Sequence, residues 1–464
     1  MSQSNIILRF LRSALGVLAA RILSFIAVFG FNAILARNLA PEDFGIFILL
    51  CSLAGLASLI ACAGMNRALV RVLAEIGIPD DPKVTRRVVN MGLGTGIVGG
   101  FIVGLVAFAI AFYVLPVAES RYAACVAALL GCVIWLRTIH LVVAETARGF
   151  HEKVASNLYG GPAGGPFPHI VFLVLLVFYF WLSDRQSVVS VLTIYLAAFV
   201  ITLPPLLWRV YTLKPSGAVK HTTSGDKLDL SFGAILAISI PLMFSQTFGL
   251  TMSQADIWLA GALGTPVALA LYCAAQRMLA FLTIPLQIAG TAIVSFVPEL
   301  VHLKKFDKLQ QMVGLAATGA GLPGLFIGCL FLLFPEIILT IAFGSYYASG
   351  AHLLQILAIG QMICIFTGPC EIVLMMAGYQ SRTLIVNSIA AFLIFTLGPL
   401  GVVYYGMTGL AVALSFVTSA QNLCNWILAK RLVGISTNVG AVDFRHFSSI
   451  SRIKALLSPS SSLT

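Results

Sequence analysis

The sequence predicts an all-α integral membrane protein with about 12 transmembrane helices, arranged in two six-helix lobes related by a pseudo-two-fold axis along the membrane normal. Three observations support this fold class. Hydrophobic residues make up 59% of the 464 residues, charged residues only 10%, and the mean hydropathy is +1.00, whereas about a quarter of the residues in soluble domains are charged. The apolar residues gather in stretches long enough to span a bilayer. A long polar segment divides these stretches into two sets.

Twelve apolar stretches account for most of the chain. Six lie in the first half, near residues 14–36, 45–65, 88–115, 122–146, 158–182 and 188–208. Six more lie in the second half, near residues 232–262, 266–296, 309–334, 351–376, 384–405 and 408–428. Each has at least the roughly 20 residues that a helix needs to cross the hydrocarbon core. No room remains for a sizeable soluble domain.

The polar segment at 209–230 is predicted to be a cytoplasmic inter-lobe loop. It separates an N-terminal lobe over 1–208 from a C-terminal lobe over 231–428, and a cytoplasmic tail over 429–464 follows. Six spans per lobe return the chain to the same side of the membrane, so we expect parallel repeats with a substrate cavity between them. The Ser-rich, basic sequence after about residue 432 is expected to be disordered or bound to a surface.

The lysines and arginines predict the orientation of the chain. If the N-terminus is cytoplasmic, 22 of the 28 basic residues lie in inner segments, three in outer segments and three inside spans. The positive-inside rule then places both termini in the cytoplasm and predicts a multi-pass protein of the inner (cytoplasmic) membrane. The net charge of +11 is mostly a signal of topology. No nucleic-acid partner is expected, because the basic residues do not cluster on one soluble face.

Two glycine patterns bear on helix packing. Gly92, Gly96, Gly100 and Gly104 recur at every fourth residue, which predicts a smooth helix face that a neighbouring backbone approaches closely. Such a stripe serves either static packing or motion. The GGPAGGPFP segment at 160–168 cannot sustain a regular helix, so we expect the fifth span to be interrupted or to begin raggedly there.

Three arginines lie alone inside predicted spans: Arg21, Arg137 and Arg277. An arginine at bilayer depth costs roughly 2.5–3.5 kcal/mol, so it persists only where it faces a protein interior or a wet cavity. Its planar guanidinium binds phosphate oxygens through two hydrogen bonds and stays charged when desolvated. We therefore predict that these arginines contact an anionic diphosphate headgroup in the cytoplasmic half of a central cavity.

The alternative is that each arginine pairs with a buried carboxylate. Asp256 and Glu371 lie inside spans, and Glu145 lies near the inner end of the fourth span. A fully paired arrangement therefore remains open. Asp256 and Glu371 are accordingly candidates either for an ion pair or for binding a coupling cation.

Other polar and aromatic side chains in these spans are candidates for contacts with a sugar headgroup, although each also suits helix packing. They are Asn32, Gln246, Gln254, Trp258, Tyr272 and Gln276. We predict no catalytic residue, no cofactor and no metal site. The nine cysteines all fall inside predicted spans, and neither a CxxC motif nor a Cys/His spacing suggests a metal ligand set.

Three segments resemble the oligosaccharide flippases of the polysaccharide transport family, which belong to the multidrug/oligosaccharidyl-lipid/polysaccharide flippase superfamily. The segment at 21–75 has an arginine in the first helix, the short outer turn LAPEDFGIF and the helix end GMNRALVR. The segment LRTIHLVVAETARGFHEK at 136–153 is similar to the fourth helix and its cytoplasmic end. The segment at 254–279 carries the aspartate, tyrosine and arginine of that family as Asp256, Tyr272 and Arg277.

The resemblance implies a transporter that turns polyprenyl-diphosphate-linked oligosaccharide repeat units from the cytoplasmic to the outer leaflet by alternating access. Such units supply surface polysaccharide, as O-antigen, capsule or exopolysaccharide. The implied partners are the lipid-linked oligosaccharide, membrane lipid, and the polysaccharide polymerase and glycosyltransferases of the same pathway. No GxxxxGK[ST] motif occurs, so a phosphate-binding P-loop is absent. An ion gradient or consumption of the flipped product is expected to supply the energy.

Two other functions remain open. A cation-coupled multidrug exporter of the same superfamily would need carboxylates in its cavity, whereas this chain has arginines inside its predicted spans. A membrane glycosyltransferase or polymerase would need a catalytic carboxylate and usually a large outer loop, and the outer loops expected here are short. We therefore predict a transporter and not an enzyme.

Overall fold

The computed structural model describes residues 3–75, 82–114, 121–150, 152–160, 165–183, 187–212 and 231–441. Within these ranges the regular structure is helical and contains no strand. Ten of the helices are long and apolar enough to cross a membrane. The chain is therefore an all-α, multi-pass membrane protein, as predicted. Most of the expected inter-lobe loop (213–230) and of the expected tail (442–464) lies outside the described residues.

The described residues of the first half of the chain form eight helices. They are α1 (Gln3–Asn38), α2 (Pro41–Ala61), α3 (Met65–Glu75), α4 (Pro82–Val114), α5 (Arg121–Gly149), α6 (Lys153–Tyr159), α7 (Pro166–Leu182) and α8 (Val188–Thr212). The start of α2 follows from its sequence. Pro41 supplies a fixed φ at the first helical position, and Glu42 and Asp43 place negative charge in the first turn, which the helix dipole favours.

The second half contains longer helices and several short ones. They are α9 (Phe232–Leu263), α10 (Pro266–His302), α11 (Phe306–Leu333), α12 (Pro335–Phe343), the 3₁₀ helix η1 (Ser345–Gly350), α13 (Ala351–Thr367), α14 (Cys370–Met376) and α15 (Gln380–Leu432). Ser231 caps the start of α9, because its hydroxyl accepts a hydrogen bond from the Ala234 backbone N–H at 3.3 Å.

The observed helices follow the predicted spans and add breaks that the apolar pattern does not mark. The interruption expected in the fifth span is confirmed, since α6 ends at Tyr159 and α7 begins at Pro166; residues 161–164 lie outside the described ranges. The tenth predicted span is broken at Gly368, between α13 and α14. The last two predicted spans form α15, whose arms meet at Gly406 with φ 59° and ψ −146°.

The helices form two compact units. The first comprises the described parts of Met1–Ala274 together with Thr340–Tyr347, and the second comprises Ala275–Leu339 and the described part of Ala348–Thr464. The helix α10 contributes to both units. The predicted repeat of two six-helix lobes, 1–208 and 231–428, stays a prediction.

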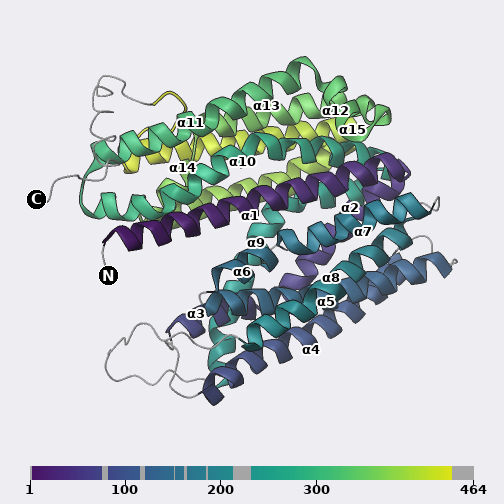
Figure 1. Ribbon diagram of the computed structural model, residues 1–464. Helices are drawn as coiled ribbons and strands as arrows, with labels where there is room; N and C mark the ends of the chain where they lie inside the picture. Colours follow the sequence, from purple (N-terminus) through teal and green to yellow (C-terminus); the bar gives the residue numbers. More distant parts are fainter. Residues whose placement is uncertain are drawn as a thin grey trace, which may run out of the picture. The chain divides into compact units, whose positions relative to one another are not determined.

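In the first unit, α5 packs between α4 and α8 (Figure 1). The glycine stripe of α4 provides the contact with α5. A Cβ on Gly104 would lie 2.7 Å from the carbonyl oxygen of Gly131 on α5, and a Cβ on Gly100 would lie 3.0 Å from the Trp135 ring. A larger residue at Gly104 would require a shift of the backbone, and one at Gly100 would require its neighbours to move slightly. The predicted close approach along this stripe is therefore confirmed.

Aromatic rings fill the interior of the first unit. Phe172 of α7 lies edge-on to Tyr195 of α8 with ring centroids 5.0 Å apart, and Tyr195 contacts Phe199 at 5.1 Å and Phe47 of α2 at 6.0 Å. All four side chains are buried. Edge-to-face contacts of this kind add to the burial of apolar area, so this cluster fixes α2, α7 and α8 together.

In the second unit, α13 packs against both α11 and α15 (Figure 1). The chain that follows α15 returns onto this group. The Thr437 hydroxyl donates to the Thr367 carbonyl at 2.7 Å, the Val439 N–H donates to the Phe366 carbonyl at 2.9 Å, and Gln310 donates to the Ser436 carbonyl at 2.8 Å. The expectation of a disordered or surface-bound segment from about residue 432 is therefore wrong for the first residues after α15, which are held by hydrogen bonds to α11 and α13.

Candidate functional site

The three arginines predicted to bind an anion lie on three different helices. Arg21 lies on α1 and is exposed, Arg137 lies on α5 with 9% of its surface exposed, and Arg277 lies on α10 and is partly buried. Arg21 and Arg137 belong to the first unit and Arg277 to the second. Their convergence on one cavity stays a prediction.

Arg137 is held inside the first unit by polar groups from two neighbouring helices. Its guanidinium donates to the Cys51 carbonyl of α2 at 3.3 Å and is hydrogen-bonded to the Tyr195 side chain of α8. Gly55 of α2 makes room for it, because a Cβ there would lie 3.2 Å from Nη2. The charge is thus solvated by a carbonyl and a hydroxyl at a position that is nearly closed to the surface.

Arg277 has a different environment. Its Nε atom is buried and has no hydrogen-bond partner among the described residues. A buried donor that is left unsatisfied costs roughly 1–3 kcal/mol, and more when the group is charged. Such an atom calls for an acceptor that the described side chains do not supply.

Asp256 and Tyr272 form a buried pair in the first unit. The Tyr272 hydroxyl donates to an Asp256 carboxylate oxygen at 3.1 Å, and the two residues are 0% and 4% exposed, respectively. The bond joins α9 to α10 across the short turn between them. In this arrangement the tyrosine hydroxyl is engaged by a carboxylate and points away from the surface.

Two of the candidate sugar contacts meet on one serine. The Trp258 indole N–H of α9 donates to the Ser52 hydroxyl of α2 at 2.7 Å, and that hydroxyl lies 3.2 Å from the Gln254 side-chain oxygen. Asn32 of α1 is 2% exposed, and its amide donates to the Val28 carbonyl one turn earlier at 2.6 Å. Gln276 lies on α10 in the second unit and is partly buried.

Glu371, the second carboxylate singled out by the sequence, is bound by amides. The Asn387 side chain donates to Glu371 at 2.8 Å, and Gln421 donates to the Asn387 oxygen at 2.8 Å. The three residues come from α14 and from both arms of α15. Within the described part of the chain, Glu371 has no basic residue within ion-pair distance.

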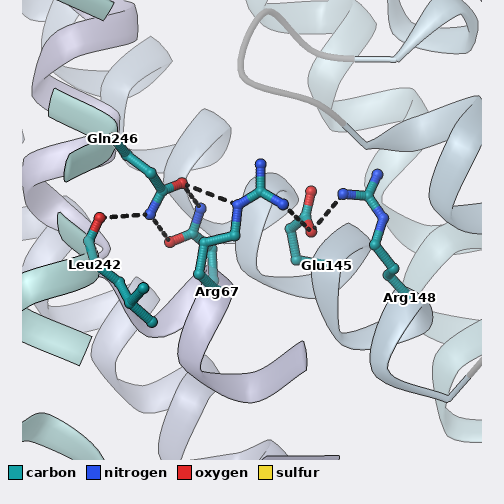
Figure 2. Close-up of polar contacts among 6 residues, drawn as sticks. Arg67, Glu145, Arg148, Leu242 and Gln246 are labelled. Carbon is teal, nitrogen blue, oxygen red and sulfur yellow. Dashed lines mark hydrogen bonds and ion pairs between the residues drawn. The ribbon is translucent and has the colours of Figure 1, made fainter. Parts of the chain in front are cut away.

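A polar network that the sequence did not predict as a unit joins three helices of the first unit and includes Gln246, one of the candidate sugar contacts (Figure 2). Glu145 of α5 accepts a hydrogen bond from Arg148 at 2.9 Å, and Arg67 of α3 lies 4.0 Å from the same carboxylate oxygen. The Arg67 Nε also donates to the Gln246 side chain of α9 at 3.4 Å. Asn66 and Gln246 exchange two amide hydrogen bonds, of 2.8 and 3.3 Å. We call this set, Asn66, Arg67, Glu145, Arg148 and Gln246, the arginine–glutamate network.

A close backbone contact fixes the geometry of this network. Gly64, which joins α2 to α3, has φ 73°, and a Cβ there would lie 1.9 Å from the Ser239 carbonyl oxygen of α9. Only glycine adopts this conformation and leaves this space. The start of α3 is thus pressed against α9, which brings Asn66 and Arg67 opposite Gln246.

Part of this network can be predicted from the sequence. Glu145 stands out as a carboxylate near the inner end of a span, where it is a candidate partner for the intramembrane arginines. Its partners in the structure are instead Arg67 and Arg148, which the charge distribution marks only as positive charges on the cytoplasmic side. The signal that could have found the pair with Arg148 is its spacing of three residues from Glu145 along one helix, a spacing that places both side chains on one face.

Comparisons with known proteins agree with this architecture. The model of a family described as "Polysaccharide biosynthesis protein" matches residues 10–159, and the model of the MatE family matches residues 241–400. No curated protein matches the chain. Among solved structures, an inward-facing multidrug resistance MATE family transporter of the MOP superfamily covers 91% of this chain and 98% of its own, with a TM-score of 0.65 and 14% identity. The chain therefore shares the fold of these transporters, and each of the two family models matches about a third of it.

Two further solved structures share this fold. An outward-facing multidrug resistance MATE family transporter covers 91% of this chain and 95% of its own, with a TM-score of 0.57 and 16% identity. A MOP superfamily transporter from Pyrococcus furiosus Vc1 (DSM3638) covers 91% and 95%, with a TM-score of 0.55 and 15% identity. The latter is described as having a binding pocket of reverse polarity, which suggests a different function. The two family models match different halves of the chain.

Proposed function

We propose that this transporter is a flippase that moves polyprenyl-diphosphate-linked oligosaccharide repeat units from the cytoplasmic to the outer leaflet by alternating access. The diphosphate would meet Arg21, Arg137 and Arg277. The sugar would contact Asn32, Gln246, Gln254, Trp258, Tyr272 and Gln276. The protein would lie in the inner membrane with both termini in the cytoplasm and would serve surface polysaccharide synthesis alongside a polymerase and glycosyltransferases. No catalytic step is required of it.

The observation that carries this proposal is the unsatisfied Nε atom of Arg277 on a membrane-spanning helix. Among the described residues, no acceptor satisfies it. A diphosphate oxygen is the acceptor that a guanidinium binds best, through short charge-assisted hydrogen bonds. An arginine kept at bilayer depth for this purpose repays its desolvation only when the anion is bound.

One comparison supports a substrate connected with polysaccharide synthesis. The family described as "Polysaccharide biosynthesis protein" matches residues 10–159, which include Arg21 and Arg137. Positive side chains at these positions fit an anionic headgroup.

The test is leaflet exchange in proteoliposomes that contain a fluorescent polyprenyl-diphosphate sugar. Arg277→Ala should lower the rate at least tenfold, and Arg277→Lys should retain part of it, because lysine keeps the charge but loses the planar fork. Arg382→Ala is the matched control, since Arg382 is an exposed arginine of the same unit and its loss should leave the rate unchanged. Wild-type rates in Arg277→Ala would contradict the diphosphate role of Arg277.

A cation-coupled multidrug exporter is the second candidate. It is favoured by the MatE match over residues 241–400 and by the carboxylates Asp256 and Glu371 within or beside the spans. The same proteoliposomes, loaded with a cationic dye under a proton or sodium gradient, separate the two functions. Gradient-driven dye export without exchange of the lipid-linked sugar would establish the exporter and remove the flippase.

A further inference from the structure

We propose that Arg67 and Arg148, oriented by the buried carboxylate of Glu145, form a docking site for the diphosphate headgroup of the substrate before it reaches the intramembrane arginines. The proposal rests on the flippase function proposed above and adds to it a site of first contact. The residues come from α3 and α5, at the end of α5 that the charge distribution predicts to be cytoplasmic. A lipid diphosphate made in the inner leaflet arrives at this end.

Charge and exposure distinguish this cluster from a closed ion pair. The side chain of Glu145 is 2% exposed, whereas those of Arg67 and Arg148 are 41% and 33% exposed. Two positive charges share one negative charge, so the cluster keeps a net positive charge. The carboxylate lies inside and the guanidiniums reach the surface, so the excess charge faces outward.

Among the described residues, both guanidiniums keep N–H donors that no hydrogen bond uses, and Figure 2 shows the contacts that are made. Arg67 uses its Nε for Gln246 and turns Nη1 toward Glu145, and Arg148 uses Nη1 for Glu145. A guanidinium carries five N–H donors, so several remain on each arginine. Because the two groups approach the same carboxylate oxygen, a single diphosphate can contact both.

The cluster is mounted rigidly, as an anion site requires. Arg67 is anchored at Nε by Gln246, and the neighbouring Asn66 exchanges two hydrogen bonds with the same glutamine. Gly64 presses the start of α3 onto α9. Arg148 lies beside the end of α6, where a Cβ on Gly160 would be 3.5 Å from its Nη2. The arginine side chains therefore lose little conformational entropy when an anion binds, and this favours affinity.

The position on α5 fits a first contact. Arg148 follows Arg137 by eleven residues on one continuous helix, which places it about 16 Å farther along the axis. Arg137 is nearly buried and engaged with Cys51 and Tyr195. An anion therefore meets the exposed arginines first and reaches Arg137 only after the surrounding helices separate.

The competing explanation is that Arg67 and Arg148 serve only topology and an ion pair with Glu145. Two variants separate the explanations. Glu145→Gln keeps both arginines and removes the buried charge. Glu145→Gln combined with Arg67→Gln and Arg148→Gln removes the arginines as well and leaves no unpaired buried charge. Since neither variant strands a buried carboxylate, both should fold, and monodispersity in detergent checks this.

Binding of geranylgeranyl diphosphate to the full-length protein in detergent is the measurement. We expect Glu145→Gln to bind at least as tightly as the wild type and the triple variant to bind at least tenfold more weakly. Lys430→Gln with Arg431→Gln removes two exposed charges from the last turn of α15 and should leave binding unchanged. Equal affinity of the triple variant and Glu145→Gln would overturn the site, as would an equal loss in the α15 control.

Two further probes identify the source of the phosphate groups. Inorganic diphosphate should compete with geranylgeranyl diphosphate in the wild type and not in the triple variant. Vesicles of phosphatidylglycerol should bind the triple variant as well as Glu145→Gln. If the triple variant loses only phosphatidylglycerol binding, the site belongs to bulk anionic lipid and the proposal is wrong.

The same variants distinguish failure of this site from failure of the flippase function. If the docking site is right and the flippase function is wrong, diphosphate binding falls in the triple variant while no variant, including the wild type, exchanges a lipid-linked sugar. If the flippase function is right and the docking site is wrong, exchange is lost in Arg277→Ala and kept in the triple variant.

Discussion

Two carboxylates of the membrane domain, Glu145 in the first unit and Glu371 in the second, are treated in opposite ways by their surroundings. Glu145 is almost completely buried and is met by two arginines, at 2.9 and 4.0 Å. Glu371 is partly buried and is met by the neutral amide of Asn387 at 2.8 Å, itself held by Gln421. One charge is compensated by opposite charges and the other only by dipoles.

The difference bears on what each carboxylate can do. A buried carboxylate between arginines orients those arginines through charge-assisted hydrogen bonds. A carboxylate held by amides keeps lone pairs that a small cation can occupy. Glu145 therefore suits anion recognition through its partners, and Glu371 suits a coupling role, which the sequence leaves open beside an ion pair.

The largest effect should follow from removing both bases around Glu145. Arg67→Met with Arg148→Met leaves a buried carboxylate without an opposite charge, which should lower the free energy of unfolding by about 3 kcal/mol. Reversible unfolding in detergent with increasing denaturant measures this. Adding Glu145→Gln to the pair should restore most of the loss, because the stranded charge is then gone.

No loss of stability in Arg67→Met with Arg148→Met would show that Glu145 is compensated by something other than these two arginines. The contrast between Glu145, compensated by arginines, and Glu371, compensated by amides, would then be wrong. A loss that Glu145→Gln fails to restore would instead assign the effect to packing of the long arginine side chains.

A second, smaller effect concerns the glycine breaks in the two units. Gly64 and Gly406 both have positive φ, at 73° and 59°, but a Cβ on Gly64 meets the Ser239 carbonyl at 1.9 Å, whereas a Cβ on Gly406 meets nothing within 4 Å. Gly406→Ala should cost about 1 kcal/mol, for the left-handed backbone alone. Gly64→Ala should cost at least about 2 kcal/mol, because the backbone of α3 must also move away from α9.

The same unfolding measurement compares the two alanine variants. Equal losses of unfolding free energy at Gly64 and Gly406 would mean that α3 moves away from α9 without loss of stability. The contact of α3 with α9 would then not hold the arginine–glutamate network rigidly. A loss in Gly64→Ala accompanied by weaker binding of geranylgeranyl diphosphate would link the helix contact to the docking site.

The sequence predicts the fold well because the bilayer imposes a strong constraint. Apolar stretches of about 20 residues form helices wherever they occur, since no other segment satisfies its backbone in lipid. The glycine stripe of α4 could also be predicted, because its regular spacing within a span places the glycines on one helix face. The sequence ends a predicted span at residue 65, next to Gly64, but it does not mark the break at Gly368, because apolar content continues through that position. The need for glycine at both positions arises from contacts distant in sequence, with Ser239 and Thr437 respectively.

The candidate site is predictable only in part. Charge is rare inside spans, so the sequence singles out Arg21, Arg137 and Arg277. The unsatisfied Nε of Arg277 fits an arginine placed inside a span. Arg67 and Arg148 do not stand out, because basic residues at inner helix ends are expected from topology alone. Their distinction from other inner charges lies in the shared carboxylate of Glu145, and that meeting of α3 with α5 depends on tertiary packing.

The smallest effect on stability is expected at Glu371. In Glu371→Gln the new side-chain oxygen can still accept from Asn387, and the removed charge had no basic partner among the described residues, so stability should change by less than about 1 kcal/mol. Asn387→Leu is the contrasting variant, because it leaves Glu371 without its donor and should cost about 1–3 kcal/mol.

If Glu371 binds the coupling ion, Glu371→Gln should also make leaflet exchange independent of an imposed proton or sodium gradient. Exchange by Glu371→Gln that follows the gradient as in the wild type would place coupling elsewhere, and Asp256 with its Tyr272 partner would be the remaining carboxylate to test.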